Sequence, residues 1–193
     1  FVFLFLPVLT QVSFAEDICV LPEMRINQRP GGAEGGPTEI FLGIITADIT
    51  SVDDVAQTLS GDFIVVTKWQ EERFGNQVGC RFPISKVWTP RLELINSANL
   101  KHKYTFQRDE IKVEHGGWIK YYQRFTGSVS TYHHLARFPF DKQNFRLRVA
   151  SAYYAREDLT LNANKDFIAI SDLINIPDWT IGEPQASVTT LDM

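Results

Sequence analysis

Cysteine and long apolar segments are both scarce in this chain of 193 residues. The two cysteines, Cys19 and Cys80, form no CxxC pair and show no Cys/His spacing typical of zinc ligands. The one long uncharged apolar segment, residues 1–15, is shorter than the roughly 20 residues that a membrane-spanning helix needs. The sequence therefore predicts no metal site, and no segment of it has the pattern of a transmembrane helix.

The chain also lacks an excess of positive charge and the motifs of common enzymes. Its 19 lysines and arginines against 23 acids give a net charge of −4, whereas nucleic-acid-binding proteins present a basic face. There is no Gly-x-Ser-x-Gly, no phosphate-binding loop and no set of nucleophile and base. Adjacent acids such as Glu71 and Glu72 would suit acid–base chemistry on a sugar, but adjacent acids in loops are usually only solvated. We expect no enzymatic activity, no cofactor and no nucleic-acid partner.

The N-terminal residues carry the features of an exported protein. Residues 1–15 end in Val-Ser-Phe-Ala and match the apolar part and cleavage site of a secretory signal without its charged start. A buried N-terminal strand or helix is the alternative. Residues 16–39, rich in proline and glycine, form an N-terminal arm. In an oxidising compartment Cys19 and Cys80 either form a disulfide or remain two thiols.

Residues 40–193 have the pattern of a single β-domain. The chain is 44% hydrophobic and 12% aromatic, which is enough for a packed core. Gly116 and Gly117 are a hairpin signal, residues 50–54 a polar turn, and residues 88–96 a short extended segment. No window has a sustained helical period. The strands we expect are residues 40–49, 62–69, 118–130, 145–150, 158–162, 167–170, 179–181 and 186–191. This spacing predicts an all-β sandwich.

Several motifs, in order along the chain, resemble those of pentameric ligand-gated ion channels, the Cys-loop receptor superfamily. Phe138, Pro139, Phe140 and Asp141 lie in a turn, Phe-Pro-Phe-Asp-x-Gln, that resembles the signature loop of the family. Residues 69–73 resemble its Trp-x-Asp-x-Arg motif with a glutamate in place of the aspartate. The segments 88–96, 117–121 and 176–179 resemble binding loop A, the strand of loop E and the segment after loop F.

The resemblance implies an extracellular ligand-binding domain with an immunoglobulin-like, twisted β-sandwich fold. Residues 40–193 would form this sandwich and stop before loop C, the last strand and the four transmembrane helices. Thr131 and Phe145 occupy the positions of the two cysteines that bracket the signature loop in animal members, which indicates the prokaryotic branch. The implied assembly is a homopentamer in the cell membrane, with this domain extracellular or periplasmic, that responds to a small ligand or to protons.

In this family the ligand lies between neighbouring subunits. Arg91 stands where the family usually has an acid, and Ala152 stands at the position of the loop B tryptophan, so an acetylcholine-like aromatic box is not expected. Arg91 and Lys120 either bind a carboxylate or are solvated strand charges. The implied ligand residues are Arg91, Ile95, Tyr153 and Tyr154 on the principal face and Ile64, Val66, Lys120 and Tyr122 on the complementary face.

The resemblance also implies a coupling end that faces the membrane. Asp53 and Asp54 of one loop, with Phe138, Pro139, Phe140 and Asp141 of the other, would pass a rearrangement on to the pore.

Histidine offers a route to a proton response. His133 and His134 point to opposite faces of a strand and make a poor metal pair, but either is a candidate pH sensor or an exposed loop residue. The alternative to a channel is a secreted β-sandwich that binds or adheres. Four further apolar stretches of about 20 residues in the gene product would distinguish the channel from it.

Overall fold

The computed structural model describes residues 19–32, 35–75, 77–103, 109–132 and 142–189. These residues form short 3-10 helices and many strands. The helices are η1 (Glu72–Phe74), η2 (Ile84–Lys86), η3 (His115–Gly117) and η4 (Lys165–Phe167). The strands are β1 (Thr38–Asp53), β2 (Thr58–Gln70), β3 (Arg81–Pro83), β4 (Leu92–Leu94), β5 (Ser97–Lys103), β6 (Glu110–Val113), β7 (Trp118–Ser130), β8 (Val149–Ser151), β9 (Leu159–Ala163) and β10 (Ala169–Ile170).

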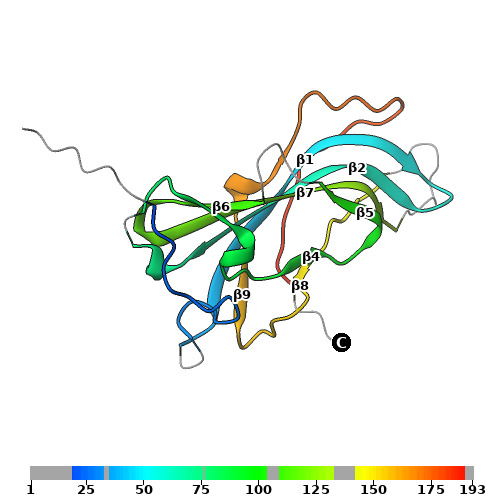
Figure 1. Cartoon of the computed structure of the whole chain (residues 1–193). Helices are drawn as coiled ribbons and strands as arrows, with labels where there is room; N and C mark the ends of the chain where they lie inside the picture. Colours follow the sequence, from blue (N-terminus) through cyan, green and yellow to red (C-terminus); the bar gives the residue numbers. More distant parts are fainter. Residues whose placement is uncertain (1–18, 33–34, 76, 104–108, 133–141, 190–193) are drawn as a thin grey trace, which may run out of the picture.

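The long strands β1, β2 and β7 form the centre of a large sheet in the order β10-β1-β2-β7-β6-β3. β6 pairs with the beginning of β7 and β5 with its second half, and β9 adds in parallel to the beginning of β1. β4 and β8 form a separate antiparallel pair, which lies below the large sheet in Figure 1. The prediction of a twisted all-β sandwich is confirmed.

The alternation along β2 explains how the large sheet packs. Phe63, Val65, Thr67 and Trp69 are each at most 2% exposed and point into the sandwich, whereas Lys68 between them is half-buried on the other face. Trp69 packs against Trp88, which lies outside the strands of the large sheet, with ring centroids 6.0 Å apart. Trp69 and Trp88, together with other apolar side chains, belong to the larger of two core clusters.

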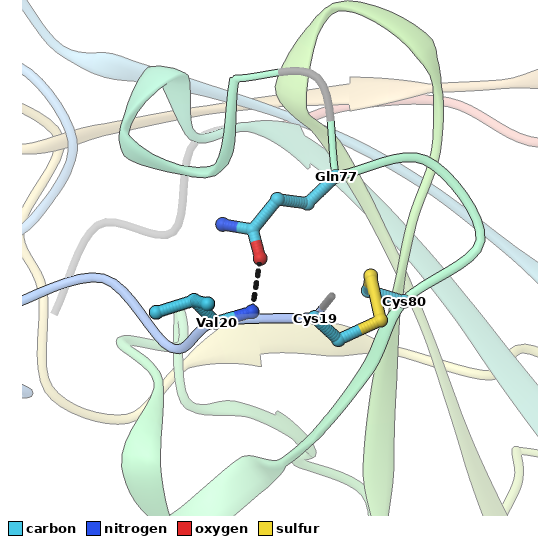
Figure 2. The surroundings of a disulfide bond; sticks show 4 residues. All are labelled: Cys19, Val20, Gln77 and Cys80. Atoms are coloured by element: carbon cyan, nitrogen blue, oxygen red, sulfur yellow. Dashed lines mark hydrogen bonds between the residues drawn. A yellow bond between two sulfur atoms is a disulfide. The ribbon is translucent and has the colours of Figure 1, made fainter. Parts of the chain in front are cut away.

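A disulfide between Cys19 and Cys80 fixes the N-terminal segment at one end of the sandwich, which settles the question that the sequence left open (Figure 2). The sulfur atoms are 2.04 Å apart, and the neighbouring Val20 N–H donates to Gln77 Oε1 over 2.7 Å. The bridge joins residues 61 positions apart, for which loop-closure entropy gives a stabilisation of about 4 kcal/mol.

The described part of the N-terminal arm is held against the sandwich by more than this bridge. Arg29 is 8% exposed, donates to the carbonyl oxygens of Gly35 and Gly36 and forms an ion pair with Asp158. The chain therefore enters β1 from a fixed position.

In the first half of the chain, one predicted turn is wrong and one strand was not predicted. β1 continues to Asp53 because Ser51, Val52 and Asp53 pair with the beginning of β2, so the turn is 54–57 rather than 50–54. β5, which the sequence did not predict, is almost entirely exposed and has no alternation to reveal it; its pairing with β7 defines it.

Among the predicted strands of the second half, β7 and β9 have the expected length, whereas β8 and β10 are shorter than expected. Residues 142–149 alternate in burial as predicted, but ladder pairing begins only at Val149. Before it, the Asn96 side chain donates to Arg146 O and accepts from Arg148 N, in place of backbone partners. Residues 179–181 and 186–189 are not strands, and 190–191 lie outside the described residues.

Candidate functional site

On the principal side, three of the four predicted residues come together at one end of the β4–β8 pair. The Arg91 guanidinium lies over the Tyr153 ring, 4.8 Å from its centroid, and the Tyr153 and Tyr154 rings meet edge to face at 5.0 Å. Tyr153 is 68% exposed, whereas the Tyr154 hydroxyl accepts a hydrogen bond of 2.7 Å from Trp88 Nε1. Arg91 and Tyr153 therefore form the exposed part of the cluster, and Tyr154 ties it to the core.

The backbone around Arg91 is fixed by the strand pair. Its φ of 48° is in the left-handed region, which residues other than glycine rarely adopt. The Arg91 carbonyl accepts from Ala152 N–H, and the Ser151 hydroxyl donates to Pro90 O while accepting from Tyr154 N–H. These bonds hold the arginine and the two tyrosines on neighbouring segments that are 60 residues apart in the sequence.

Ile95 does not belong to this cluster. It follows the opposite end of β4, where its N–H donates to Arg148 O, and it is 45% exposed. Three residues of β4 separate it from Arg91.

On the complementary side, Lys120 lies between two aromatic rings. Its ammonium is 5.4 Å from the Tyr122 centroid and 4.8 Å from that of Phe167 in η4. Lys120 and Tyr122 are two positions apart on β7 and point to the same face, as their spacing predicts. Phe167 reaches this face because η4 packs across β1: Asn164 N–H donates to Leu42 O, and the aromatic residue lies directly over Gly43.

Ile64 and Val66 lie on the same face of β2 but differ in exposure. Val66 pairs across the sheet with Gly43 and with Tyr122, and it is only 1% exposed. Ile64 is half-buried. Val66 is therefore a support beneath this face rather than part of its surface.

A second lysine on this face has a different environment. Lys68, directly opposite Lys120 on β2, lies 5.3 Å from the Trp118 centroid and pairs with Glu114 at 2.7 Å. The hydrogen bond from Lys68, strengthened by the charges of Lys68 and Lys120, lowers the pKa of Glu114 despite some desolvation. The charge of Lys68 is thus matched within the chain.

The two clusters lie on opposite faces of the sandwich. Tyr154 bonds to Trp88, which packs on Trp69 inside, whereas the next residue of β2, Lys68, points outward beside Lys120. Sandwich layers are about 10 Å apart, and the core fills the space between them. In Figure 1, β4 and β8 lie below the large sheet and the short orange turn η4 on its upper side. One ligand can contact both clusters only if two chains contribute to its site.

An open pocket of about 490 Å³ does not include these residues. Its lining comes from β4, β5 and β7 and from Asp109, which accepts a hydrogen bond from the Tyr121 hydroxyl. Within the described residues, no group of three or more histidine, cysteine, aspartate or glutamate side chains is arranged to hold a metal ion.

The β1–β2 turn is at the far end of the sandwich from the disulfide. Asp53 Oδ1 accepts from Val55 N–H and Ala56 N–H, Asp54 follows in the turn, and Val55 is 97% exposed at the tip. β2 has 13 residues, which at strand spacing separates the two ends by about 40 Å. The other predicted coupling residues, Phe138, Pro139, Phe140 and Asp141, and both His133 and His134 lie outside the described residues.

The chain matches the family "Neurotransmitter-gated ion-channel ligand binding domain" over residues 20–190. It belongs to this family. The resemblance that the motifs indicated is confirmed at this level.

Individual relatives are distant and are animal receptors. The gamma-aminobutyric acid receptor subunit theta of Mus musculus is 24% identical over 166 residues, which cover 82% of this chain and 26% of the relative. The acetylcholine receptor subunit alpha-1-B of Xenopus laevis is 26% identical, with 72% and 32% covered, and the neuronal acetylcholine receptor subunit beta-2 of Rattus norvegicus is 23% identical, with 84% and 34% covered. The chain spans about a quarter to a third of the length of these relatives. No helix in the described part of the chain is long and apolar enough to cross a bilayer.

Proposed function

We propose that this chain is the extracellular ligand-binding domain of a homopentameric ligand-gated ion channel in the cell membrane. A small ligand binds between neighbouring subunits, with Arg91, Tyr153 and Tyr154 on one side and Lys120 and Tyr122 on the other. Binding biases a pore between closed and open states through the β1–β2 turn at the membrane end.

The position of the two clusters is the observation that carries this proposal. Each combines a cation, the exposed Arg91 or the half-buried Lys120, with an aromatic ring, and they lie on opposite faces of one sandwich. A closed ring of identical chains brings the principal face of each subunit against the complementary face of the next, which is the heterologous contact that cyclic symmetry produces. Such a ring completes one site at every interface.

Membership of the family supports the coupling part of the proposal. The β1–β2 turn, with Asp53 and the exposed Val55, precedes β2, which carries Lys68, and lies beside the end of β7, which carries Lys120. A shift at the site therefore has a direct path to the turn along β2 and β7. The prokaryotic branch remains a prediction that depends on Thr131 and Phe145 at the positions of the bracketing cysteines. A proton response through His133 or His134 is the second candidate for the stimulus.

Electrophysiology of the full-length gene product in a bilayer tests this function. We expect protons, primary amines or small carboxylates to evoke a current, and Arg91→Ala or Tyr153→Ala to raise the half-maximal concentration of the active compound. Lys101→Ala is the matched control, because Lys101 is exposed on β5 and pairs with Thr126, which is six residues along β7 from Lys120. If a well-expressed, membrane-inserted protein passes no current under any of these conditions, the channel function is wrong and a secreted binding module is favoured.

A further inference from the structure

The aromatic rings of both clusters already hold cations that belong to the chain itself. The Tyr153 ring carries the Arg91 guanidinium at 4.8 Å, and its neighbour Tyr154 meets it edge to face. The Tyr122 and Phe167 rings both carry the Lys120 ammonium. A ring attracts a cation through the negative potential of its face, so a cation bound there takes up the attraction that an amine ligand would use.

Neither of these two cations forms an ion pair with a carboxylate among the residues that the structure describes. Within the described part of the chain, four basic side chains form ion pairs with carboxylates: Arg29, Lys68, Arg73 and Arg124. Arg91 and Lys120 are in none of these pairs, and their side chains make no hydrogen bond there. Their backbones and rings fix their positions while their N–H donors remain available, which is the arrangement that a charge-assisted hydrogen bond to a ligand needs.

The pair next to Lys120 shows what such a lysine binds in this chain. Lys68 and Lys120 are directly opposite each other on β2 and β7, and each lies over aromatic rings of the same face. In addition to its ring contact, the Lys68 ammonium donates a hydrogen bond of 2.7 Å to the Glu114 carboxylate. Lys120 has the ring contacts but interacts with the same carboxylate only through its charge, because the Glu114 hydrogen bond is made with Lys68.

An amine fits this interface poorly for a second reason. It would enter between a guanidinium on one side and an ammonium on the other, and like charges that approach within a few ångströms repel. It would also have to displace Arg91 from Tyr153, or Lys120 from Phe167, and the carboxylate beside Lys120, that of Glu114, is already paired with Lys68.

We propose that the ligand of this interface is a small molecule carrying carboxylate, which binds the Arg91 guanidinium of one subunit and the Lys120 ammonium of the next. This inference rests on the proposed inter-subunit site. Phe167 is a positioning residue in it: η4 holds the ring over Gly43, and the ring holds the ammonium toward the interface. Sequence reasoning did not identify Phe167, because only the packing of η4 on β1 brings it to Lys120.

Succinate and putrescine form a matched pair of probes, since both have a four-carbon chain and they carry opposite charges. On the full-length protein in a bilayer we expect succinate to evoke a current and putrescine to evoke none. Arg91→Gln and Lys120→Gln should each raise the half-maximal succinate concentration about tenfold or more, as expected for loss of a charged hydrogen-bond partner. Phe167→Leu should raise it by a smaller factor. Phe167→Trp, which keeps an aromatic ring, and Lys101→Gln, on exposed β5, should leave it at the wild-type value.

Intrinsic tryptophan fluorescence separates failure of the ligand class from failure of the channel. Trp88 bonds to Tyr154 beside Arg91 and should report succinate binding without any current. A fluorescence change that Arg91→Gln abolishes, in a protein that passes no current, would keep the ligand class and reject the channel. Currents evoked by putrescine or protons but not by succinate, or a succinate response unchanged in Arg91→Gln and Lys120→Gln, would overturn the carboxylate assignment.

Discussion

At the scale of single residues, the most deeply buried acid of the described chain is Glu71, in the segment that resembles the Trp-x-Asp-x-Arg motif. It is 1% exposed and accepts hydrogen bonds from the Arg73 side chain and from Arg73 N–H. Arg73 in turn donates to Gln28 O, so this pair also fixes the N-terminal segment. Glutamate stands here in place of the aspartate of the motif, and both of its carboxylate oxygens accept from the Arg73 guanidinium.

We predict that the two partners of this pair are unequal in their effect on stability. Arg73→Ala leaves a buried carboxylate without its cation and should cost about 3 kcal/mol or more, the range for a broken buried pair. Glu71→Gln should cost less, because the Arg73 side chain is 28% exposed and reaches water. Urea unfolding of the variants measures both values. An Arg73→Ala protein as stable as Glu71→Gln would show that the carboxylate finds other partners.

The predictability of the candidate site also differs from residue to residue. Arg91, Tyr153 and Lys120 were identified from motifs, and their exposure and ring contacts agree with a surface role. Val66 was identified by the same route, but it is covered, because alternation along a strand gives the face of a residue and not what packs over that face. Phe167 had no signal in the sequence, since its role depends on contacts between segments more than 40 residues apart.

At the scale of elements, η4 adds the Phe167 ring to the face of the large sheet on which Lys120 lies. It crosses β1 closely, and an added Cβ at Gly43 would lie 2.6 Å from both the Cβ and the carbonyl oxygen of Phe167. Contact with a backbone atom cannot be relieved by a side-chain rotation alone. Glycine at position 43 is therefore required for the ring of Phe167 to reach Lys120.

We predict that Gly43→Ala displaces η4 and lowers ligand sensitivity without unfolding the sandwich. Loss of one cation–π contact should raise the half-maximal ligand concentration about two- to fivefold, since such contacts at exposed sites contribute about 0.5–1 kcal/mol. Dose–response curves for current measure the change. Gly182→Ala is the control, because an added Cβ there meets no atom within 4 Å. Equal sensitivity in Gly43→Ala and wild type would show that η4 does not position Lys120.

The elements themselves were predictable where side chains alternate strongly. β7 has the predicted bounds, residues 118–130, and β2 is longer than predicted because its first residues pair across the hairpin with β1. β5 escaped prediction because it is a mostly exposed strand whose register is set by β7. Residues 179–181 have strand-like composition but no partner strand within the described residues, so composition alone misled there.

At the scale of the whole molecule, three structural features lie at different positions along the sandwich. The disulfide and the N-terminal segment stabilise one end, the two cation–aromatic clusters lie on opposite faces between the ends, and the β1–β2 turn forms the other end. No single chain can close both clusters on one ligand. In the proposed function, the assembly rather than the single chain is the unit that binds the ligand.

Co-expression of two defective subunits tests this claim most directly. Arg91→Gln subunits keep an intact Lys120 face, and Lys120→Gln subunits keep an intact Arg91 face, so a mixed ring contains some interfaces with both intact faces. With succinate, or whichever agonist the screen of currents identifies, we predict that co-expression restores part of the current at the wild-type half-maximal concentration, although neither variant alone responds there. If the mixture responds only at the concentrations that the single variants need, the ligand does not bind between subunits through these two residues.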